Sequence, residues 1–156
     1  MPPGPVTGAA VVLAVLVLAT AAGLLRVRRD GRVRATSTPT GTGGPVAVAL
    51  AALGVRPGTT TLVQFSTVVC APCVAARRVC AEVAGATAGV AHLEVDAEAE
   101  LAAVRALDVW RAPTVLVVDR HGTVRHRVAG VPRAGELRAA LASLTGLDPA
   151  VPAVCE

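Results

Sequence analysis

The stretch TLVQFSTVVCAPC, residues 61–73, decides how the rest of this chain is expected to fold. Its segment Leu62 to Phe65 is short, apolar and rich in β-favouring side chains, which predicts a buried strand. The residues after the second cysteine, 74–84, have helical composition. Cys70 and Cys73 are therefore expected where a strand gives way to the N-terminus of a helix.

That position favours a reactive thiol. The first N–H groups of a helix and its dipole stabilise negative charge, which lowers the pKa of a thiol placed there. Two cysteines three residues apart at a helix start are also close enough to form a disulfide. Pro72 suits the first turn, where its missing N–H has no partner to lose. We interpret Cys70 as the attacking thiolate and Cys73, expected to be more buried, as the resolving thiol.

Two other interpretations of the cysteine pair stay open. Free cysteine is a small hydrophobe, so the pair would also be compatible with an inert core. A zinc site usually needs four ligands, and only Cys80, Cys155 and three scattered histidines add to the pair. A c-type haem needs His directly after Cys73, where Val74 stands. We prefer the redox interpretation and expect neither a metal nor an organic cofactor.

Charge is concentrated in one short segment. The length of 156 residues predicts one domain with an appendage. The net charge of the chain is +4. Between residues 26 and 34 there are five Arg and one Asp, so 5 − 1 = +4, and the other 10 Arg balance 10 Asp and Glu. No basic domain face is therefore predicted, and we expect no nucleic-acid partner.

The basic segment follows an uncharged stretch, Val6 to Leu25. As a helix, its twenty residues would be about 30 Å long, which predicts a single transmembrane anchor. A cleaved signal peptide and a buried helix are the alternatives, although Met1 to Pro5 lacks the positive start of a signal peptide. Because positive flanks stay in the cytoplasm, we expect a cell-membrane protein with its domain on the cytoplasmic side.

We divide the chain into four expected parts. They are a transmembrane anchor (1–25), a basic juxtamembrane segment with a flexible linker (26–44), a folded domain (45–146) and a C-terminal tail (147–156). The linker is predicted from the Thr-, Ser- and Gly-rich composition of 36–44. Residues 31–35 are compatible with either a short first strand or juxtamembrane chain, and the sequence does not separate the two.

Within the folded part, apolar patterns predict alternating strands and helices. A short helix at 45–55 precedes elements at 62–65, 74–84, 90–96, 97–107, 115–118, 123–129 and 133–144, in the order β-α-β-α-β-β-α. A strand–helix–strand unit implies a parallel crossover, and a hairpin adds antiparallel strands. The expected fold class is α/β, with a mixed central sheet flanked by helices.

Five short motifs together resemble the thioredoxin family in order and spacing. They are LVQF (62–65), CAPC (70–73), VD (95–96), APT (112–114) and VAG (128–130), and the similarity covers roughly residues 59–144. The resemblance implies a thioredoxin-like fold, with Cys70 and Cys73 as the redox pair. It also implies a cis Pro113 facing them, Ala112 offering its backbone to a substrate strand, and Gly130 bordering the substrate groove. The residues alone would predict a trans Pro113, because only about 5–6% of X-Pro bonds in folded proteins are cis.

The chain departs from the family pattern at several positions. Val69 and Ala71 stand where the family usually has Trp and Gly around the first cysteine, and Gln64 stands in place of a buried acid. His92 falls near a usual Lys, and we prefer to read it as an exposed residue at a strand end rather than as a titrating partner. Trp110 is interpreted as a packing or groove-rim residue.

The resulting functional expectation is a membrane-anchored thiol–disulfide oxidoreductase that acts in cell redox homeostasis. Its partners would be protein disulfide substrates, an electron-donor reductase and, through the N-terminal helix, the membrane. We expect a monomer, a core position for Cys80 and an exposed, free Cys155. The alternative is a non-catalytic docking or redox-sensing module of the same fold, and an outward-facing oxidase or reductase would follow from the opposite topology.

Overall fold

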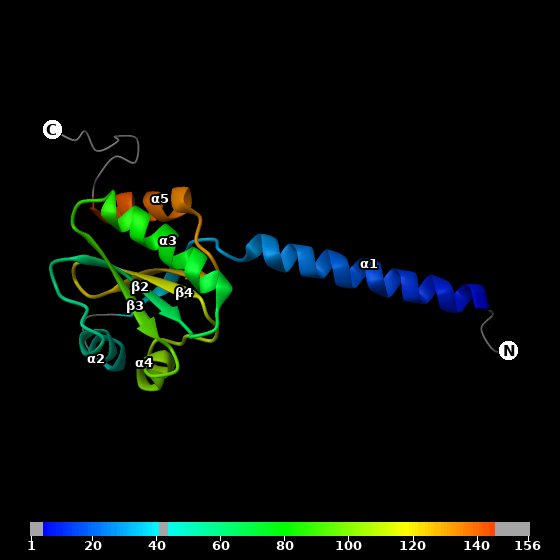
Figure 1. The fold of residues 1–156 in the computed structure, drawn as a ribbon, viewed down its shortest axis with the longest axis horizontal. Coiled ribbons are helices and arrows are strands. Elements are labelled where there is room, and N and C mark those ends of the chain that lie inside the picture. Colours follow the sequence, from blue (N-terminus) through cyan, green and yellow to red (C-terminus); the bar gives the residue numbers. More distant parts are fainter. Residues whose placement is uncertain (1–4, 41–43, 146–156) are drawn as a thin grey trace. The chain divides into compact units, whose positions relative to one another are not determined.

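The structure is a computed structural model that describes residues 5–40 and 44–145. Its contacts divide the chain into two compact units, Met1–Asp30 and Gly31–Glu156. The first unit holds a single helix, α1 (Pro5–Arg29), drawn in blue in Figure 1. The second unit holds the sheet and all other helices of the described residues.

The predicted transmembrane anchor at residues 6–25 is wrong. Among the residues that the structure describes, no helix combines the length and the apolar character needed to cross a membrane. The same finding contradicts the expected single-pass location in the cell membrane with the domain on the cytoplasmic side.

The second unit is built on a five-stranded mixed sheet. The strands are β1 (Arg34–Thr40), β2 (Thr60–Ser66), β3 (Val90–Asp96), β4 (Thr114–Val118) and β5 (Val124–Ala129). Their spatial order is β1-β5-β4-β2-β3, in which only the β2–β3 pair is parallel (Figure 1). The α/β class and the mixed sheet are thereby confirmed.

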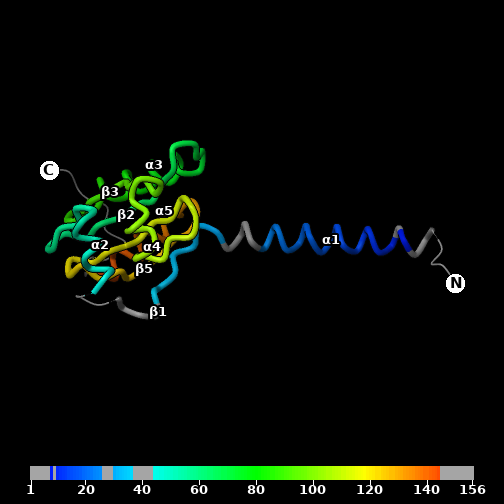
Figure 2. The backbone as a smooth tube through the Cα atoms, turned by 90° about the horizontal axis from the view of Figure 1, so that it is seen from below, coloured from blue at the N-terminus to red at the C-terminus, as the bar shows by residue number. Residues whose placement is uncertain are grey.

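One strand lies where the sequence analysis placed a flexible linker. β1 pairs antiparallel with β5 at one edge of the sheet (Figure 2). Arg34 lies opposite Arg127, and Ala35 lies opposite His126. Residues 41–43 of the expected linker lie outside the described residues. A polar, Thr-rich segment can form a strand here because an edge strand forms backbone hydrogen bonds on one side only.

Four helices cover the two faces of the sheet. They are α2 (Pro45–Ala52), α3 (Ala71–Gly85), α4 (Leu101–Ala106) and α5 (Ala134–Thr145). α3 and α5 lie over one face, and α2 and α4 lie over the other (Figure 1). α4 is shorter than the predicted helix at 97–107, since it begins only after its N-cap Glu100. In the turn before it, the carboxylate of Asp96 accepts a hydrogen bond from the amide of Glu98.

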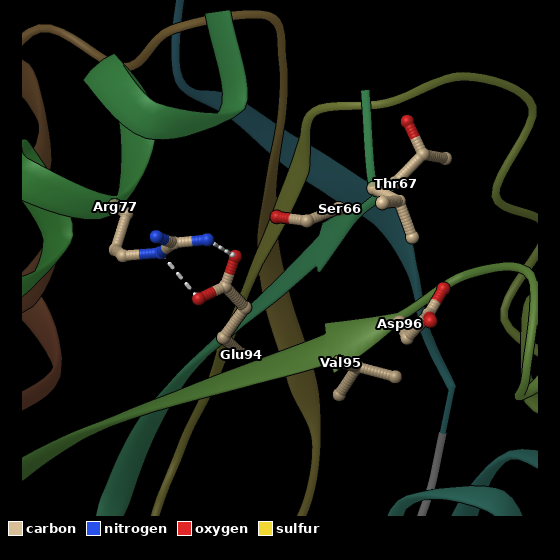
Figure 3. Close-up of a pocket in the computed structure, with 7 residues that line it drawn as sticks. Ser66, Thr67, Arg77, Glu94, Val95 and Asp96 are labelled. Atoms are coloured by element: carbon tan, nitrogen blue, oxygen red, sulfur yellow. Dashed lines mark hydrogen bonds and ion pairs between the residues drawn. The ribbon is translucent and has the colours of Figure 1, made fainter. Parts of the chain in front are cut away.

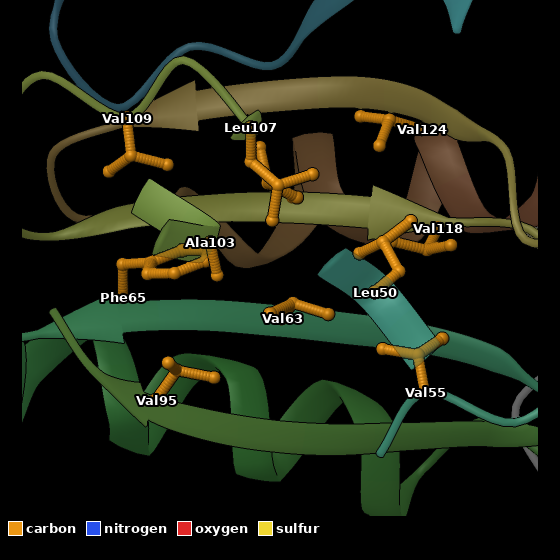
Figure 4. Close-up of a cluster of buried hydrophobic side chains, with 11 residues drawn as sticks. Leu50, Val55, Val63, Phe65, Val95, Ala103, Leu107, Val109, Val118 and Val124 are labelled. Atoms are coloured by element: carbon orange, nitrogen blue, oxygen red, sulfur yellow. The ribbon is translucent and has the colours of Figure 1, made fainter. Parts of the chain in front are cut away.

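Each face carries its own apolar cluster. The α2/α4 cluster includes Val63 and Phe65 of β2, Leu50 of α2 and Ala103 of α4 (Figure 4). The α3/α5 cluster has eight buried members, which are Leu62, Cys80, Val83, Val115, Val117, Val128, Leu137 and Leu141. β2 contributes side chains to both clusters, so apolar packing stabilises it on both faces. Burying one large apolar side chain contributes about 1.5–3 kcal/mol.

The central strand sets the direction of the side chains that matter below. Successive residues of a strand point to opposite faces, so Leu62 and Gln64 face α3 while Val63 and Phe65 face α2 and α4. All seven residues of β2 are buried. A polar side chain at position 64 must therefore find its hydrogen-bond partners beneath α3.

Candidate active site

The two cysteines of the CAPC motif occupy the N-terminus of α3. Cys70 is the N-cap, with an extended backbone (φ −146°, ψ 92°), and its Sγ accepts a hydrogen bond of 3.2 Å from the amide of Cys73. A disulfide joins the two sulfurs at 2.01 Å, with the Cα atoms 5.2 Å apart. Cys70 is partly exposed and Cys73 is 2% exposed, so an incoming molecule can reach only the first sulfur.

The helix that carries the pair is fixed to the sheet by one apolar face. Cys73, Ala76, Cys80 and Val83 are its buried residues, at the spacing of three and four that places side chains on one side of a helix. Pro72 lies in the first turn, where no N–H partner is required. The N-terminal N–H groups and the helix dipole would stabilise a Cys70 thiolate once the disulfide is reduced.

Pro113 lies at the same edge of the sheet as the cysteines. β2 and β4 are antiparallel, and Phe65 at the end of β2 pairs with Thr114 at the start of β4. The loop from Ser66 to Cys70 and the residue that precedes Thr114 therefore leave the sheet side by side. The Ala112-Pro113 peptide bond is cis, as the resemblance implied and the residues alone did not.

Gly130 joins this edge from β5. Its amide donates a hydrogen bond of 2.8 Å to the carbonyl oxygen of Pro113, and its φ of 96° is one that glycine adopts readily. Pro113 is buried, whereas Ala112 and Gly130 are partly exposed. The structure thus brings Cys70, Cys73, Ala112, Pro113 and Gly130 to one edge of the sheet, while their roles toward a substrate stay predictions.

The loop before Pro113 is held by contacts that sequence reasoning missed. Arg127 of β5 donates hydrogen bonds of 2.5 Å and 2.7 Å to the carbonyl oxygens of Leu107 and Asp108. Asp108 has a φ of 53° and accepts a hydrogen bond of 2.6 Å from the indole nitrogen of Trp110. Trp110 is 87% exposed, which excludes the packing role and leaves the rim position a prediction. No local pattern around Arg127 signals this partnership across nineteen residues.

A buried amide lies beneath the cysteine helix. Gln64 is fully buried, and its Nε2 donates to the carbonyl oxygen of Cys73 at 3.1 Å and to Oγ of Ser66 at 2.8 Å. Its Oε1 lies 3.2 Å from Nε2 of His92. His92 is half-buried, so the interpretation of it as an exposed strand-end residue is wrong.

An ion pair borders a cavity between the ends of β2 and β3 and the side of α3. The cavity has a volume of about 330 Å³, and Arg77 of α3 contacts Glu94 of β3 at its wall, with bonds of 2.5 Å and 2.7 Å (Figure 3). The hydrogen bond from Arg77 is the main reason why the pKa of Glu94 is lowered. The pKa of His92 is also lowered, mainly by burial, with Glu94 opposing and Arg77 reinforcing that effect.

The remaining described thiol is separate from the pair. Cys80 is fully buried, and burial, followed by the charge of Glu94, raises its pKa to about 12. It belongs to the core, as its expected position implied. Cys155 lies outside the described residues. Among the residues that the structure describes, no group of three or more His, Cys, Asp or Glu side chains could hold a metal ion.

Solved structures of thioredoxins are similar to this architecture. Desulfothioredoxin from Desulfovibrio vulgaris Hildenborough, in its reduced form, is similar at 27% identity and a TM-score of 0.51, over 58% of this chain and 88% of that chain. Thioredoxin from Trypanosoma brucei brucei is similar at 23% identity and a TM-score of 0.52, over 72% and 98%. Fasciola hepatica thioredoxin is similar at 20% identity and a TM-score of 0.52, over 61% and 89%.

Sequence comparisons add nothing to this assignment, because no family model and no curated protein matches the chain. The similarity to the three solved structures is one of fold, and it extends over most of the length of each of them. A cysteine pair at the start of α3 and a cis proline immediately before β4 accompany that shared architecture here. The chain therefore has the thioredoxin-family fold.

Proposed function

We propose that this protein is a thiol–disulfide oxidoreductase that reduces disulfides in other proteins through Cys70 and Cys73. The observation that carries the proposal is the asymmetry of the bonded pair. Cys70 is accessible at the N-terminus of α3, and Cys73 is buried behind it. A thiolate attacks a disulfide only where it is accessible, and the second thiol must be near but shielded until the first has reacted.

The proposed reaction begins with the reduced pair. The Cys70 thiolate attacks one sulfur of the substrate disulfide, so a Cys70–substrate disulfide forms and the other substrate sulfur leaves as a thiolate. Cys73 then loses its proton and attacks Sγ of Cys70. The Cys70–Cys73 disulfide forms, and the second substrate sulfur leaves as a thiolate and is protonated by water. Two electrons pass from the protein dithiol to the substrate disulfide.

The edge around Pro113 supports binding of an extended substrate backbone. Ala112 is partly exposed immediately before the cis bond. Gly130, also partly exposed, lies beside Pro113, because its amide donates a hydrogen bond to the Pro113 carbonyl oxygen. We assign these three residues to substrate binding. The proposal also includes a reductase that returns two electrons to the pair, and a monomer as the active form.

Trapping the intermediate tests this mechanism. In the Cys73→Ser variant, attack by Cys70 should proceed and the mixed disulfide should accumulate, visible as an adduct by non-reducing electrophoresis and mass spectrometry. Cys80→Ala is the matched control, because Cys80 is buried in the same helix but is not part of the pair. It should form no lasting adduct and should reduce insulin at the wild-type rate.

Two results would contradict the proposal. Turnover of insulin by Cys73→Ser at the wild-type rate would exclude the two-cysteine mechanism. No insulin reduction by the wild-type protein, with dithiothreitol in excess and the uncatalysed rate subtracted, would exclude catalysis. The latter outcome would favour the non-catalytic, redox-sensing alternative.

A further inference from the structure

The NH₂ group and the carbonyl oxygen of the Gln64 side chain both have hydrogen-bond partners in the core of this unit. Gln64 is 0% exposed, and a buried amide without partners would be strongly unfavourable. Both hydrogens of its Nε2 are used, toward the carbonyl oxygen of Cys73 and toward Oγ of Ser66, and its Oε1 faces Nε2 of His92. The three partners come from α3, β2 and β3, so the amide joins the cysteine helix to two strands.

The partners fix which way the amide points. A carbonyl oxygen can only accept, so the NH₂ group of Gln64 must face Cys73 and the oxygen must face His92. Because that oxygen can only accept, Nε2 of His92 must carry a hydrogen. A neutral His92 is therefore the Nε2–H tautomer, and the imidazolium form would donate from the same nitrogen.

We propose that Gln64 and His92 are positioning residues for the resolving thiol: His92 fixes the orientation of the Gln64 amide, and this amide holds the carbonyl of Cys73 and with it the first turn of α3. The inference rests on the function proposed above. Neither side chain touches the reacting sulfurs in these contacts, so each acts through the backbone of Cys73.

The step that this arrangement serves is the second one. The first attack on a substrate depends on the accessible Sγ of Cys70. Resolution requires Sγ of Cys73 to approach Sγ of Cys70 in line with the bond between Cys70 and the substrate sulfur. A misplacement of about 1 Å in a reacting group can slow a reaction by about 10²-fold. Loss of the hydrogen bond between His92 and Gln64 should therefore slow resolution and leave the first attack unchanged.

The charged groups around His92 allow positioning and titration to be separated. Two charged groups act on His92: Glu94, on the same face of β3, and Arg77 of α3. From β2, the neutral amide of Gln64 faces Nε2 of His92. His92 donates from Nε2 whether neutral or protonated, so its titration changes the charge near Cys73 without breaking the bond to Gln64. A substitution that keeps a donor but cannot titrate then isolates the positioning role.

Three variants carry the test. His92→Leu removes the donor, His92→Gln keeps an N–H donor that does not titrate, and His126→Leu is the matched control. His126 is also half-buried, with a pKa lowered mainly by burial, but it lies on β5 and is not one of the hydrogen-bond partners of Gln64. Each is made in the full chain and checked for folding by circular dichroism and thermal unfolding.

Rapid-mixing experiments with a peptide disulfide separate the two steps. We expect the rate of mixed-disulfide formation to stay within about two-fold of wild type in all three variants. The rate of its resolution should fall about ten-fold in His92→Leu. It should return to within about three-fold of wild type in His92→Gln and remain unchanged in His126→Leu. The resolution rate of His92→Gln should also lose any dependence on pH that the wild type shows near the pKa of His92.

A second measurement does not depend on activity. Nitrogen chemical shifts of the histidine rings in the wild-type protein report the tautomer of His92, which should be Nε2–H above its pKa, and the Gln64→Leu variant should shift the Nε2 signal. An Nδ1–H tautomer, equal slowing of both steps in His92→Leu, or equal defects in His92→Gln and His92→Leu would each overturn the proposal. If the wild-type protein forms no mixed disulfide, the proposed function fails, and the tautomer measurement still decides the geometry.

Discussion

Arg127 on β5 donates a hydrogen bond of 2.7 Å from Nη1 to the carbonyl oxygen of Asp108, nineteen residues earlier in the chain. Its Nη2 reaches the carbonyl of Leu107 as well. These carbonyls end α4 and begin the loop that carries Trp110 to Pro113. Asp108 has a φ of 53°, in the left-handed region that few residues other than glycine, asparagine and aspartate adopt, and the guanidinium fixes the carbonyls on both sides of its backbone turn.

Replacing Arg127 with Leu should therefore weaken both the fold and substrate binding. Two carbonyls lose a charged donor, which predicts a loss of about 1–3 kcal/mol in the free energy of unfolding by urea. The loosened loop should raise KM for a protein disulfide more than it lowers kcat. Arg125→Leu is the control, since Arg125 lies on the same strand and makes only a 3.9 Å ion pair with Asp119. Identical behaviour of the two variants would contradict this role.

The ion pair between Arg77 and Glu94 predicts part of the acid sensitivity of the fold. The hydrogen bond from Arg77 lowers the pKa of Glu94 in the folded state below its ordinary value of 4.5. A lowered pKa stabilises the folded protein above pH 4.5, and that contribution is lost as pH falls through the folded pKa. The side chains are partly exposed, so the effect is small.

The measurement is the difference between the urea unfolding free energies at pH 7 and pH 3. This difference should be smaller in Glu94→Gln than in wild type, because the amide does not titrate. Glu100→Gln, at the exposed N-cap of α4 where no side-chain capping bond is made, is the control. An unchanged difference in Glu94→Gln would show that the pair does not contribute.

Cys80 should be inert in the folded protein. Its full burial and its raised pKa of about 12 leave almost no thiolate at pH 8, so iodoacetamide should modify reduced Cys70 long before Cys80. Mass spectrometry of peptides from the protein in a Cys155→Ser background measures this order. Labelling of Cys80 should begin only in denaturant. Equal rates of labelling for the two thiols without denaturant would contradict its burial.

Gly31 is required where the second unit begins. Its φ is 77°, its amide donates to the carbonyl of Ala129, and an added Cβ would lie 2.2 Å from the carbonyl oxygen of Val131. Gly31→Ala should therefore combine left-handed strain with a backbone clash. Gly89→Ala, at a φ of 73° with open space around it, carries the strain alone, about 1–2 kcal/mol.

Thermal and urea unfolding of these two variants separates the effects. The destabilisation of Gly31→Ala should exceed that of Gly89→Ala by a margin that reflects the clash with Val131. Since Gly31 bonds to the end of β5, the excess should also loosen the pairing of β1 with β5, measured as faster amide hydrogen exchange of β1. Equal destabilisation of the two variants would mean that the chain relieves the clash at no free-energy cost.

The sequence predicted the elements whose signals are local. The strand at 62–65, the helix after the CAPC motif and the hairpin that ends at Ala129 were predicted because apolar periodicity and turn residues act within a few positions. The N-terminal segment forms a helix, α1, but the predicted membrane span is wrong, because no helix of the described residues is long and apolar enough to cross a membrane. Local patterns also failed for β1, whose polar residues form a strand only because the edge of β5 offers them backbone partners.

The sequence by itself therefore determined that two cysteines stand at the start of a helix that follows a buried strand, since all three features lie within one short run of residues. Only the tertiary structure decided what surrounds them. Gln64 meets His92 across 28 residues because parallel pairing of β2 with β3 puts both side chains under α3, and Arg127 meets Asp108 because β5 returns beside β4. Such contacts depend on strand register, which side chains far apart in the chain set jointly.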